Sequence, residues 1–340
     1  MEYIKPVDGV TADFGRYDQI YEPEDNYTPA ESLDDVILKF DEFKFLSLPE
    51  RERVLDIIKE RDIVLLYGWR GSGKTWFAMS LMNAIATGTK FGPWSVLKPV
   101  RCLYLDGEMA IDEMQRRSAA INKGGKVIEP YWLYSGHYTT YRAFPHPDLE
   151  SPKWRDEILD FMIRKKIKLW FIDNISSISL EAEKNAESWA PINRWLVDLR
   201  HYNISTIILH HMGKNRVSGQ ATGRGTSKME DNADLCIALD QPAKYTADMG
   251  CCFDMRFTKS RLKQSEMELI KPYFFTLEGD ADKGDLMWTW KPSELETKKK
   301  VAELLSQGWS GKDIANQLEI TGGRVSQIRK QLAAEGKAKK

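Results

Sequence analysis

Four apolar runs in the first two thirds of the chain end in polar residues, as the strands of a buried parallel sheet do. The runs span residues 62–67, 100–108, 168–176 and 204–211. Helical patterns lie between them, at residues 76–86, 110–121 and 186–202. This repeated β-α order predicts an α/β fold, in which a mostly parallel sheet carries helices on both faces.

From about residue 234 the pattern changes to apolar runs that follow one another without helices between them. These runs read DLCIALD, CCFDMRFTKS, YFFTLEG and LMWTW. They predict strands that extend the sheet in antiparallel fashion. Within the parallel part, the polar strand ends meet at the carboxyl edge, where binding sites form in such sheets.

The C-terminal end of the chain predicts a small all-α module. Its three helical patterns span residues 298–307, 311–318 and 322–335. Ser310 and Thr321 are suited to cap the second and third helices. The apolar face that these helices share consists of Leu304, Ile314, Leu318, Val325, Ile328 and Leu332. The chain thus divides into an acidic N-terminal arm (1–35), an α/β core (36–292) and this module (293–340).

Charge is distributed unevenly along the 340 residues, although the formal net charge is only −1. Residues 298–340 contain ten Lys and Arg against four Asp and Glu, a net charge of +6, so the remainder carries −7. A basic module on an acidic body predicts a polyanionic partner for the module. A solvated, lysine-rich chain end is the alternative.

The four cysteines form no CxxC pair and show no zinc-binding spacing. Three of them lie in apolar runs, so we expect buried, reduced thiols and a cytoplasmic location. They are Cys102, Cys236, Cys251 and Cys252. No run reaches eighteen apolar residues, and the first residues lack the features of an export signal, so we expect no association with a membrane.

The segment LLYGWRGSGKTWFAMSLM at 65–82 predicts a phosphate-binding loop between a strand and a helix. Glycines let backbone N–H groups turn inward around an anion, and the helix directs its positive end to the same place. Lys74 would reach the β and γ phosphates of ATP, and Thr75 would bind Mg²⁺. The expected nucleotide-binding residues are Gly68, Gly71, Ser72, Gly73, Lys74, Thr75 and Trp76. The alternative is a glycine-rich turn that binds nothing.

Two carboxylates follow predicted strands and could complete such a site. Asp173 ends the run at 168–176, where an acid would hold Mg²⁺ through water. Glu108 follows another strand and could orient or deprotonate the water that attacks the γ-phosphate. The alternatives are that Asp173 caps the next segment and that Glu108 caps the helix near Ala110.

Five segments occur in an order that resembles the RecA-like P-loop ATPases, and most closely the RepA-type hexameric helicases of plasmids and mobile elements. The segments are LYLDGEM, FIDNISSI, ILHHMGK, GRGTSKMEDNADLCIALD and FTKSR. The resemblance covers residues 40–290 and implies a RecA-like core. It also implies that Asp173 is the Walker B acid, that Glu108 is the catalytic glutamate, and that His211 senses the γ-phosphate.

The same resemblance gives roles to two cations in FTKSR. Lys259 and Arg261 lie two residues apart, so they would share one face of a strand. In the family, such a pair reaches the γ-phosphate of a neighbouring subunit, as an arginine finger does. A closed ring of six subunits would follow. Surface charges at the end of a strand are the alternative.

Two segments are candidates for binding DNA. The glycine-rich loop at 213–228 follows His211, and its candidate residues are Lys214, Arg216, Arg224 and Lys228. The C-terminal module resembles a helix-turn-helix with residues 321–331 as the recognition helix. Its candidates are Arg324, Ser326, Gln327 and Lys330 for the groove and Arg329 for the backbone. A solvated loop and a protein-docking module are the alternatives.

Together these features predict an ATP-hydrolysing, ring-forming DNA motor. We expect a replicative helicase of a plasmid, phage or integrated element. It would form a homohexamer, bind single- or double-stranded DNA and interact with replication-initiation proteins. One alternative is an ATP-switched, DNA-binding regulator or loader without unwinding activity. A P-loop kinase for a small molecule is a weaker alternative, because no acceptor pocket is apparent.

Overall fold

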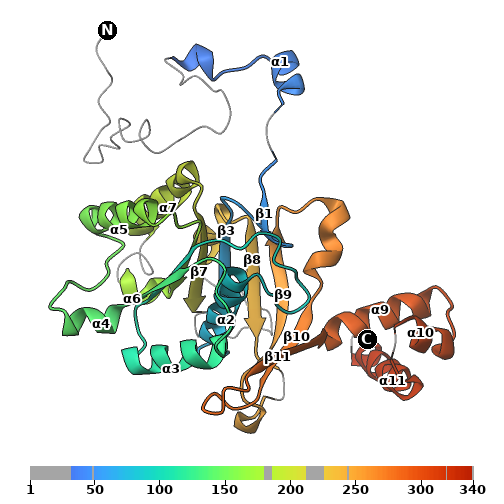
Figure 1. The fold of residues 1–340 in the computed structure, drawn as a ribbon. Coiled ribbons are helices and arrows are strands. Elements are labelled where there is room, and N and C mark those ends of the chain that lie inside the picture. Colours follow the sequence, from blue (N-terminus) through green and yellow to red (C-terminus); the bar gives the residue numbers. More distant parts are fainter. Residues whose placement is uncertain are drawn as a thin grey trace.

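The computed structural model describes residues 32–47, 50–179, 186–211, 226–242, 245–318 and 320–338. Their main feature is a nine-stranded sheet with the order β11-β10-β9-β8-β3-β7-β6-β4-β5 (Figure 1). Six strands are parallel: β3 (Ile63–Gly68), β4 (Cys102–Asp106), β5 (Tyr131–Ser135), β6 (Leu169–Asp173), β7 (Ser205–His211) and β8 (Leu235–Asp240). Three antiparallel strands extend it: β9 (Cys252–Ser260), β10 (Tyr273–Glu278) and β11 (Met287–Pro292). The predicted fold class is therefore confirmed.

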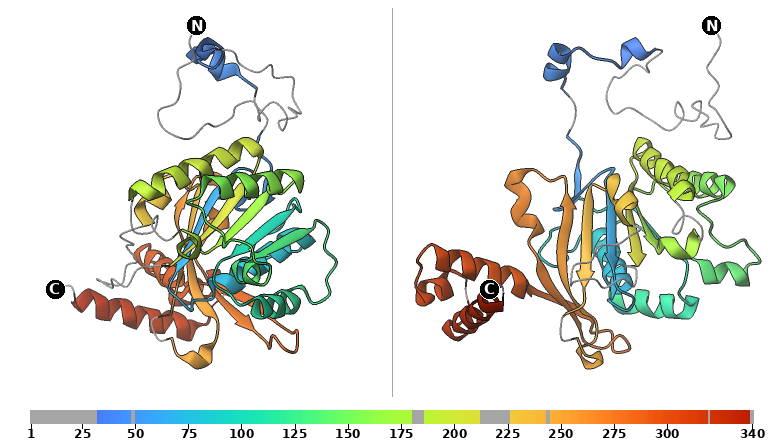
Figure 2. Two further views of the ribbon diagram at one scale, coloured as in Figure 1. Left: turned by 90° about the vertical axis from the view of Figure 1, so that its left-hand side faces the viewer. Right: turned by 180° about the vertical axis from the view of Figure 1, so that it is seen from behind.

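Alternate residues of the central strands enter two separate cores, one on each face of the sheet. Leu66 packs in the core that contains Phe77 of helix α2 (Lys74–Thr87). The neighbouring Leu65 packs in the opposite core with residues of α5 (Pro152–Arg164) and α7 (Ala186–Asp198). Figure 2 shows α5 and α7 side by side along one side of the sheet. Helices therefore cover both faces, as predicted.

The remaining elements are short or connect the strands. They are α1 (Phe40–Phe45), β1 (Arg53–Leu55), β2 (Ile58–Lys59), α3 (Ile111–Asn122), α4 (Gly136–Tyr141), α6 (Ile175–Ile178) and α8 (Thr226–Asp231). Four 3₁₀ helices accompany them in the described residues: η2 (Leu33–Asp35), η3 (Leu199–Tyr202), η4 (Ala247–Met249) and η5 (Gln264–Ile270).

Strand β5 and helix α5 are among the elements of the parallel part that were not predicted. Strand β5 lies at the edge of the sheet and is only partly buried, and its apolar run YWLY is short. Helix α5 begins with Ser151 as N-cap, whose hydroxyl accepts a hydrogen bond from the Trp154 amide, and with Pro152 in its first turn. Serine followed by proline is a helix-start signal, and it could have identified this helix from the sequence.

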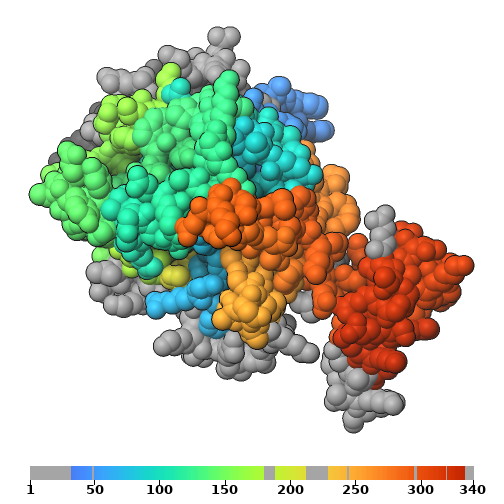
Figure 3. All heavy atoms as spheres, turned by 60° about the horizontal axis from the view of Figure 1, so that its bottom comes forward, coloured from blue at the N-terminus to red at the C-terminus, as the bar shows by residue number. Residues whose placement is uncertain are grey.

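The C-terminal module contains α9 (Glu294–Ser306), α10 (Gly311–Gln317) and α11 (Gly322–Ala338). Figure 3 shows it protruding from the surface beside β10 and β11. A small core of its own holds it together, formed by Val301, Ile314, Ala315, Val325 and Ile328. The hydroxyl of Ser310 caps α10, and that of Thr321 accepts from the Arg324 amide, as expected. Helix α9 begins four residues before the predicted start.

The first described segment, residues 32–47, contains large apolar side chains that are 41 to 76% exposed. They are Leu33, Val36, Ile37, Leu38, Phe40, Phe43, Phe45 and Leu46. None of these residues belongs to either core of the sheet.

The four cysteines are free thiols, as expected. Three are buried, and Cys251 is half-buried beside the glycine-rich loop. No helix of the described residues is long and apolar enough to cross a membrane.

Candidate functional site

The glycine-rich loop leaves the buried strand β3 and enters α2 through positions that only glycine fits. A Cβ on Gly68 would lie 2.5 Å from the carbonyl oxygen of Leu239, and one on Gly73 2.2 Å from the Cys251 sulfur. Gly71 and Gly73 also have φ values of +75° and +88°, a region that side chains disfavour. The loop therefore brings bare backbone to the positive end of α2, which is a suitable cradle for phosphate.

Lys74 lies inside this loop and is almost fully buried. Its Nζ donates hydrogen bonds to the carbonyl oxygens of Gly68 (2.9 Å) and Trp69 (2.7 Å). Burial lowers the pKa of Lys74 to about 8, although the nearby charges of Asp173 and Glu108 raise it. An ammonium held in a poorly solvated loop gains strongly from a phosphate, so this residue fits a nucleotide.

Thr75 and Asp173 meet at the carboxyl edge of the sheet. The Asp173 carboxylate accepts hydrogen bonds from the Thr75 hydroxyl and from the Tyr104 hydroxyl, the latter at 2.7 Å. Burial raises the pKa of Asp173, because desolvation disfavours its charge. A hydroxyl and a carboxylate beside a phosphate cradle are ligands that Mg²⁺ prefers, so these two residues would hold it.

The residues considered as helix caps do not act as caps. Asn174, not Asp173, caps α6, because its side-chain oxygen accepts from the amide of Ser177 at 3.2 Å. Helix α3 has Ala110 as N-cap and shows no side-chain cap hydrogen bond. Glu108 is exposed two residues beyond β4, and its charge acts on Lys74. Both carboxylates are thus directed to the site by the strand ends.

His211 lies beside Gly68 in the register of β7 and β3. The amide of Asn174 is 3.1 Å from its Nε2, and because the Asn174 oxygen is already engaged by Ser177, the amide nitrogen donates. Burial and the charge of Lys74 lower the pKa of His211 to about 4. The imidazole is therefore neutral near pH 7 and carries its proton on Nδ1. His210 is buried and, as the next residue along the strand, lies on its other face.

Asp106 is a candidate site residue that the motifs did not identify. It ends β4 directly beside Asp173 in register, and its Oδ1 accepts hydrogen bonds from the amides of Met109 and Glu108, the latter at 3.0 Å. Burial and the charge of Asp173 raise the pKa of Asp106 to about 7. The sequence does contain a signal for Asp106, because it ends the run LYLD in the same way as Asp173 ends the run WFID.

We expect Asp106→Asn to stabilise the protein at pH 8 by on the order of 5 °C in Tm, with a smaller gain at pH 5. The folded pKa of about 7 lies above the ordinary value of 3.8, so ionisation costs wild-type stability as pH rises toward 7. Thermal melts from pH 5 to 8 measure the difference. Exposed Asp156→Asn is the control, and a gain that shrinks with rising pH would contradict the prediction.

Lys259 and Arg261 lie far from the loop of their own chain. Ser260, between them, pairs with Leu235 at the amino end of β8, whereas Gly68 is level with Leu239. Four residues of strand, about 13 Å, separate these levels. An arginine at this edge cannot reach a phosphate bound at the carboxyl edge of the same sheet.

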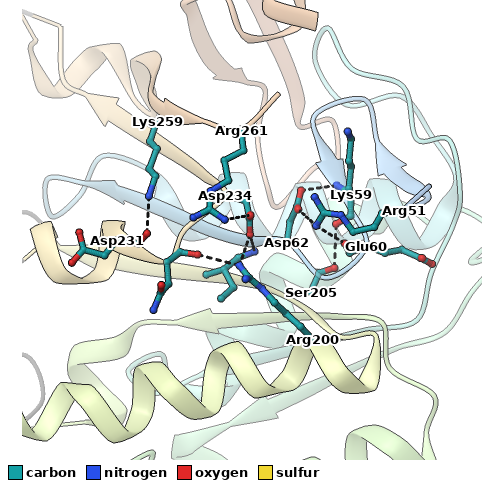
Figure 4. A network of polar contacts seen from close by, with 12 residues as sticks. Arg51, Lys59, Glu60, Asp62, Arg200, Ser205, Asp231, Asp234, Lys259 and Arg261 are labelled. Carbon is teal, nitrogen blue, oxygen red and sulfur yellow. Dashed lines mark hydrogen bonds and ion pairs between the residues drawn. The ribbon is translucent and has the colours of Figure 1, made fainter. Parts of the chain in front are cut away.

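Lys259 and Arg261 extend in the same direction from the end of β9 (Figure 4). Strand β9 ends at Ser260, so Arg261 lies just beyond it. Lys259 Nζ donates to the carbonyl oxygens of Glu230 and Asp231, the latter at 2.9 Å, whereas Arg261 pairs with Asp234 (Figure 4). The two side chains therefore have different partners.

The side chains of the DNA-binding candidates on α11 lie within the described residues, whereas those of the loop do not. Lys214, Arg216, Arg224 and the side chain of Lys228 lie outside the described residues. On α11, the residues Ser326, Gln327, Arg329 and Lys330 are exposed. Arg324 is half-buried and forms an ion pair of 2.7 Å with Glu294, so a groove contact would compete with this pair.

A family model described as AAA domain matches residues 28–217, which is more than half of the chain. The chain belongs to this family. The solved structure of a KaiC-like protein from the hyperthermophilic archaeon Pyrococcus horikoshii OT3 is similar, with 18% identity and a TM-score of 0.45. The match covers 72% of this chain and 99% of that one. A search of the curated proteins finds no match.

Membership of the AAA domain family agrees with the sheet order and with the loop between β3 and α2. This AAA domain protein is a P-loop ATPase.

Proposed function

We propose that this protein is an ATP-hydrolysing DNA motor that works as a ring, and specifically a RepA-type replicative helicase of a plasmid, phage or integrated mobile element. The observation that supports this proposal most is that the nucleotide site and the two candidate finger residues lie at opposite edges of the sheet. A phosphate cradle and two carboxylates lie at the carboxyl edge of the sheet, whereas Lys259 and Arg261 lie at the amino edge. A second subunit would bring such parts together.

In the proposed site each residue has one task. Lys74 would bind the β and γ phosphates, and Thr75 and Asp173 would hold Mg²⁺, which neutralises phosphate charge when bound. Glu108 would orient the attacking water, and Asp106 would fix the turn that carries Glu108 through its bonds to the backbone amides. His211, as a neutral donor, would respond to the presence of the γ-phosphate.

The remaining requirement is a cation on the far side of the γ-phosphate. Arg261 of an adjacent subunit would supply it, since its own chain holds it at the opposite edge. An interface that joins one edge to the other is head-to-tail, and such interfaces close into rings when the rotation allows. This supports a homo-oligomer, and we propose six subunits.

Two features support DNA as the partner of this motor. The C-terminal module carries a net charge of +6 from residue 298 onward, and its candidates Ser326, Gln327, Arg329 and Lys330 are exposed on α11. The loop at 213–228 lies mostly outside the described residues, and its basic composition supports a second contact. An ATP-switched regulator or loader would share the basic module, so activity must distinguish the two.

The test is steady-state ATP hydrolysis with and without single-stranded DNA, in samples sized by mass photometry. We expect a ring-sized species whose turnover rises by about ten-fold with DNA and which separates a forked duplex. Slow turnover that ignores DNA, together with assembly that depends on nucleotide, would instead identify an ATP-switched regulator or loader.

A further inference from the structure

An ion cluster surrounds Asp234 at the amino edge of the sheet, directly before β8 (Figure 4). The Asp234 side chain is only 7% exposed. Its Oδ2 accepts from the amide of Ile63 at 2.9 Å and from Arg200 Nη2 at 2.7 Å. Its Oδ1 accepts from Arg261 Nη1 at 3.1 Å. One buried carboxylate thus joins the central strand β3, the helix η3 and Arg261.

The two oxygens of Asp234 have different functions in this cluster. The bonds to Oδ2 anchor the carboxylate to the backbone of β3 and to Arg200, which also donates to the Asn232 carbonyl at 3.1 Å. An acid anchored in this way has little freedom to rotate. Oδ1 therefore presents a fixed acceptor to Arg261.

Arg261 is held by Asp234 at two points. Its amide donates to the Asp234 carbonyl at 3.0 Å, and its guanidinium donates through Nη1. The Arg261 side chain is nevertheless 51% exposed. A guanidinium has five N–H groups in a rigid fork, so one edge can stay on Asp234 while another meets a second anion.

We propose that Asp234 is a positioning residue that orients the Arg261 guanidinium toward the γ-phosphate in a neighbouring subunit. This inference rests on the proposed function, in which Arg261 acts across the interface. Asp234 itself touches no substrate. Its charge holds a flexible side chain in one pose before the subunits meet, which reduces the ordering that the transition state requires.

The test is Asp234→Asn in the full-length protein, because the amide keeps the shape and removes the charge. We expect kcat for ATP hydrolysis to fall by about 10- to 100-fold, since misplacement of a catalytic group by about 1 Å has effects of this size. KM for ATP should stay near the wild-type value, because the phosphate loop lies at the other edge of the sheet.

Asp62→Asn is the matched control, since Asp62 is a buried carboxylate near the same edge that pairs with Arg51 and not with Arg261. If Asp234 acts on Arg261, the control keeps kcat near the wild-type value. Mixing Asp234→Asn with Glu108→Gln protein should also restore turnover, because each variant supplies what the other lacks. Should Asp234→Asn fail to fold, Asp234→Glu displaces the charge by one methylene group and should lose kcat in the same way.

The outcomes distinguish the positioning role of Asp234 from the proposed function on which it rests. If Arg261→Ala is inactive but Asp234→Asn turns over at the wild-type rate, the positioning role is overturned and the proposed function stands. A loss of kcat that mixing does not restore, or that Asp62→Asn matches, also overturns it. If Arg261→Ala itself keeps full turnover, the proposed function fails.

Discussion

Alanine at Lys74 is expected to lower kcat/KM for ATP hydrolysis by about 10³-fold or more, because the variant loses the charge that meets the β and γ phosphates. The ammonium lies within the loop, on the carbonyl oxygens of Gly68 and Trp69, and burial holds its pKa at about 8. ATP should restore the fully charged form, since a phosphate favours a neighbouring cation. Without this ammonium, only backbone N–H groups of the loop remain to bind the phosphates.

Phosphate release at saturating and limiting ATP measures this loss, and binding of a fluorescent ATP analogue shows how much of it lies in affinity. Lys153→Ala is the control, because Lys153 is exposed on α5, on the opposite face of the sheet. Thermal melts with and without ATP separate misfolding from lost binding. Turnover that persists in a folded Lys74→Ala protein would remove the basis for a nucleotide site at this loop.

Replacement of Arg261 by alanine is expected to leave ATP binding intact and to lower kcat by about 10³-fold, the smallest loss typical of an arginine finger. Arg261 lies beyond the end of β9, at the edge opposite to the loop, so it makes no contact with nucleotide in its own chain. Arg256→Ala is the matched control on the same strand, where Arg256 pairs with Asp240 at 2.5 Å.

Mixing two inactive variants tests whether this arginine acts across the interface. In rings of Arg261→Ala and Glu108→Gln protein at equal amounts, about a quarter of the head-to-tail interfaces combine an intact Glu108 with an intact Arg261. Turnover should therefore return to a clear fraction of the wild-type rate. The control mixture of Lys74→Ala with Glu108→Gln should stay inactive, since both defects lie in the same half of the site. An equal result in the two mixtures would argue against a finger in trans.

Features that depend on local chemistry were predicted from the sequence alone. Strands buried on both faces must be apolar throughout, which revealed β3, β4, β6 and β7. The glycine spacing around Gly68 and Gly73 reflects backbone that must approach without side chains. The caps Ser310 and Thr321 marked α10 and α11 for the same local reason. Edge strand β5 was not predicted, although its residues YWLY form a short apolar run.

The tertiary structure alone decided which of these chemical groups meet. Strand register, which depends on pairing between distant segments, placed Asp106 beside Asp173 and His211 beside Gly68. The antiparallel pairing of β9 with β8 places Arg261 at the edge away from the phosphate loop, and the FTKSR motif alone does not indicate at which edge it lies. Asp234 became an anchor only because β3 and η3 converge on it. Local sequence therefore determined the elements and the phosphate loop, whereas long-range pairing decided the partners of each charge.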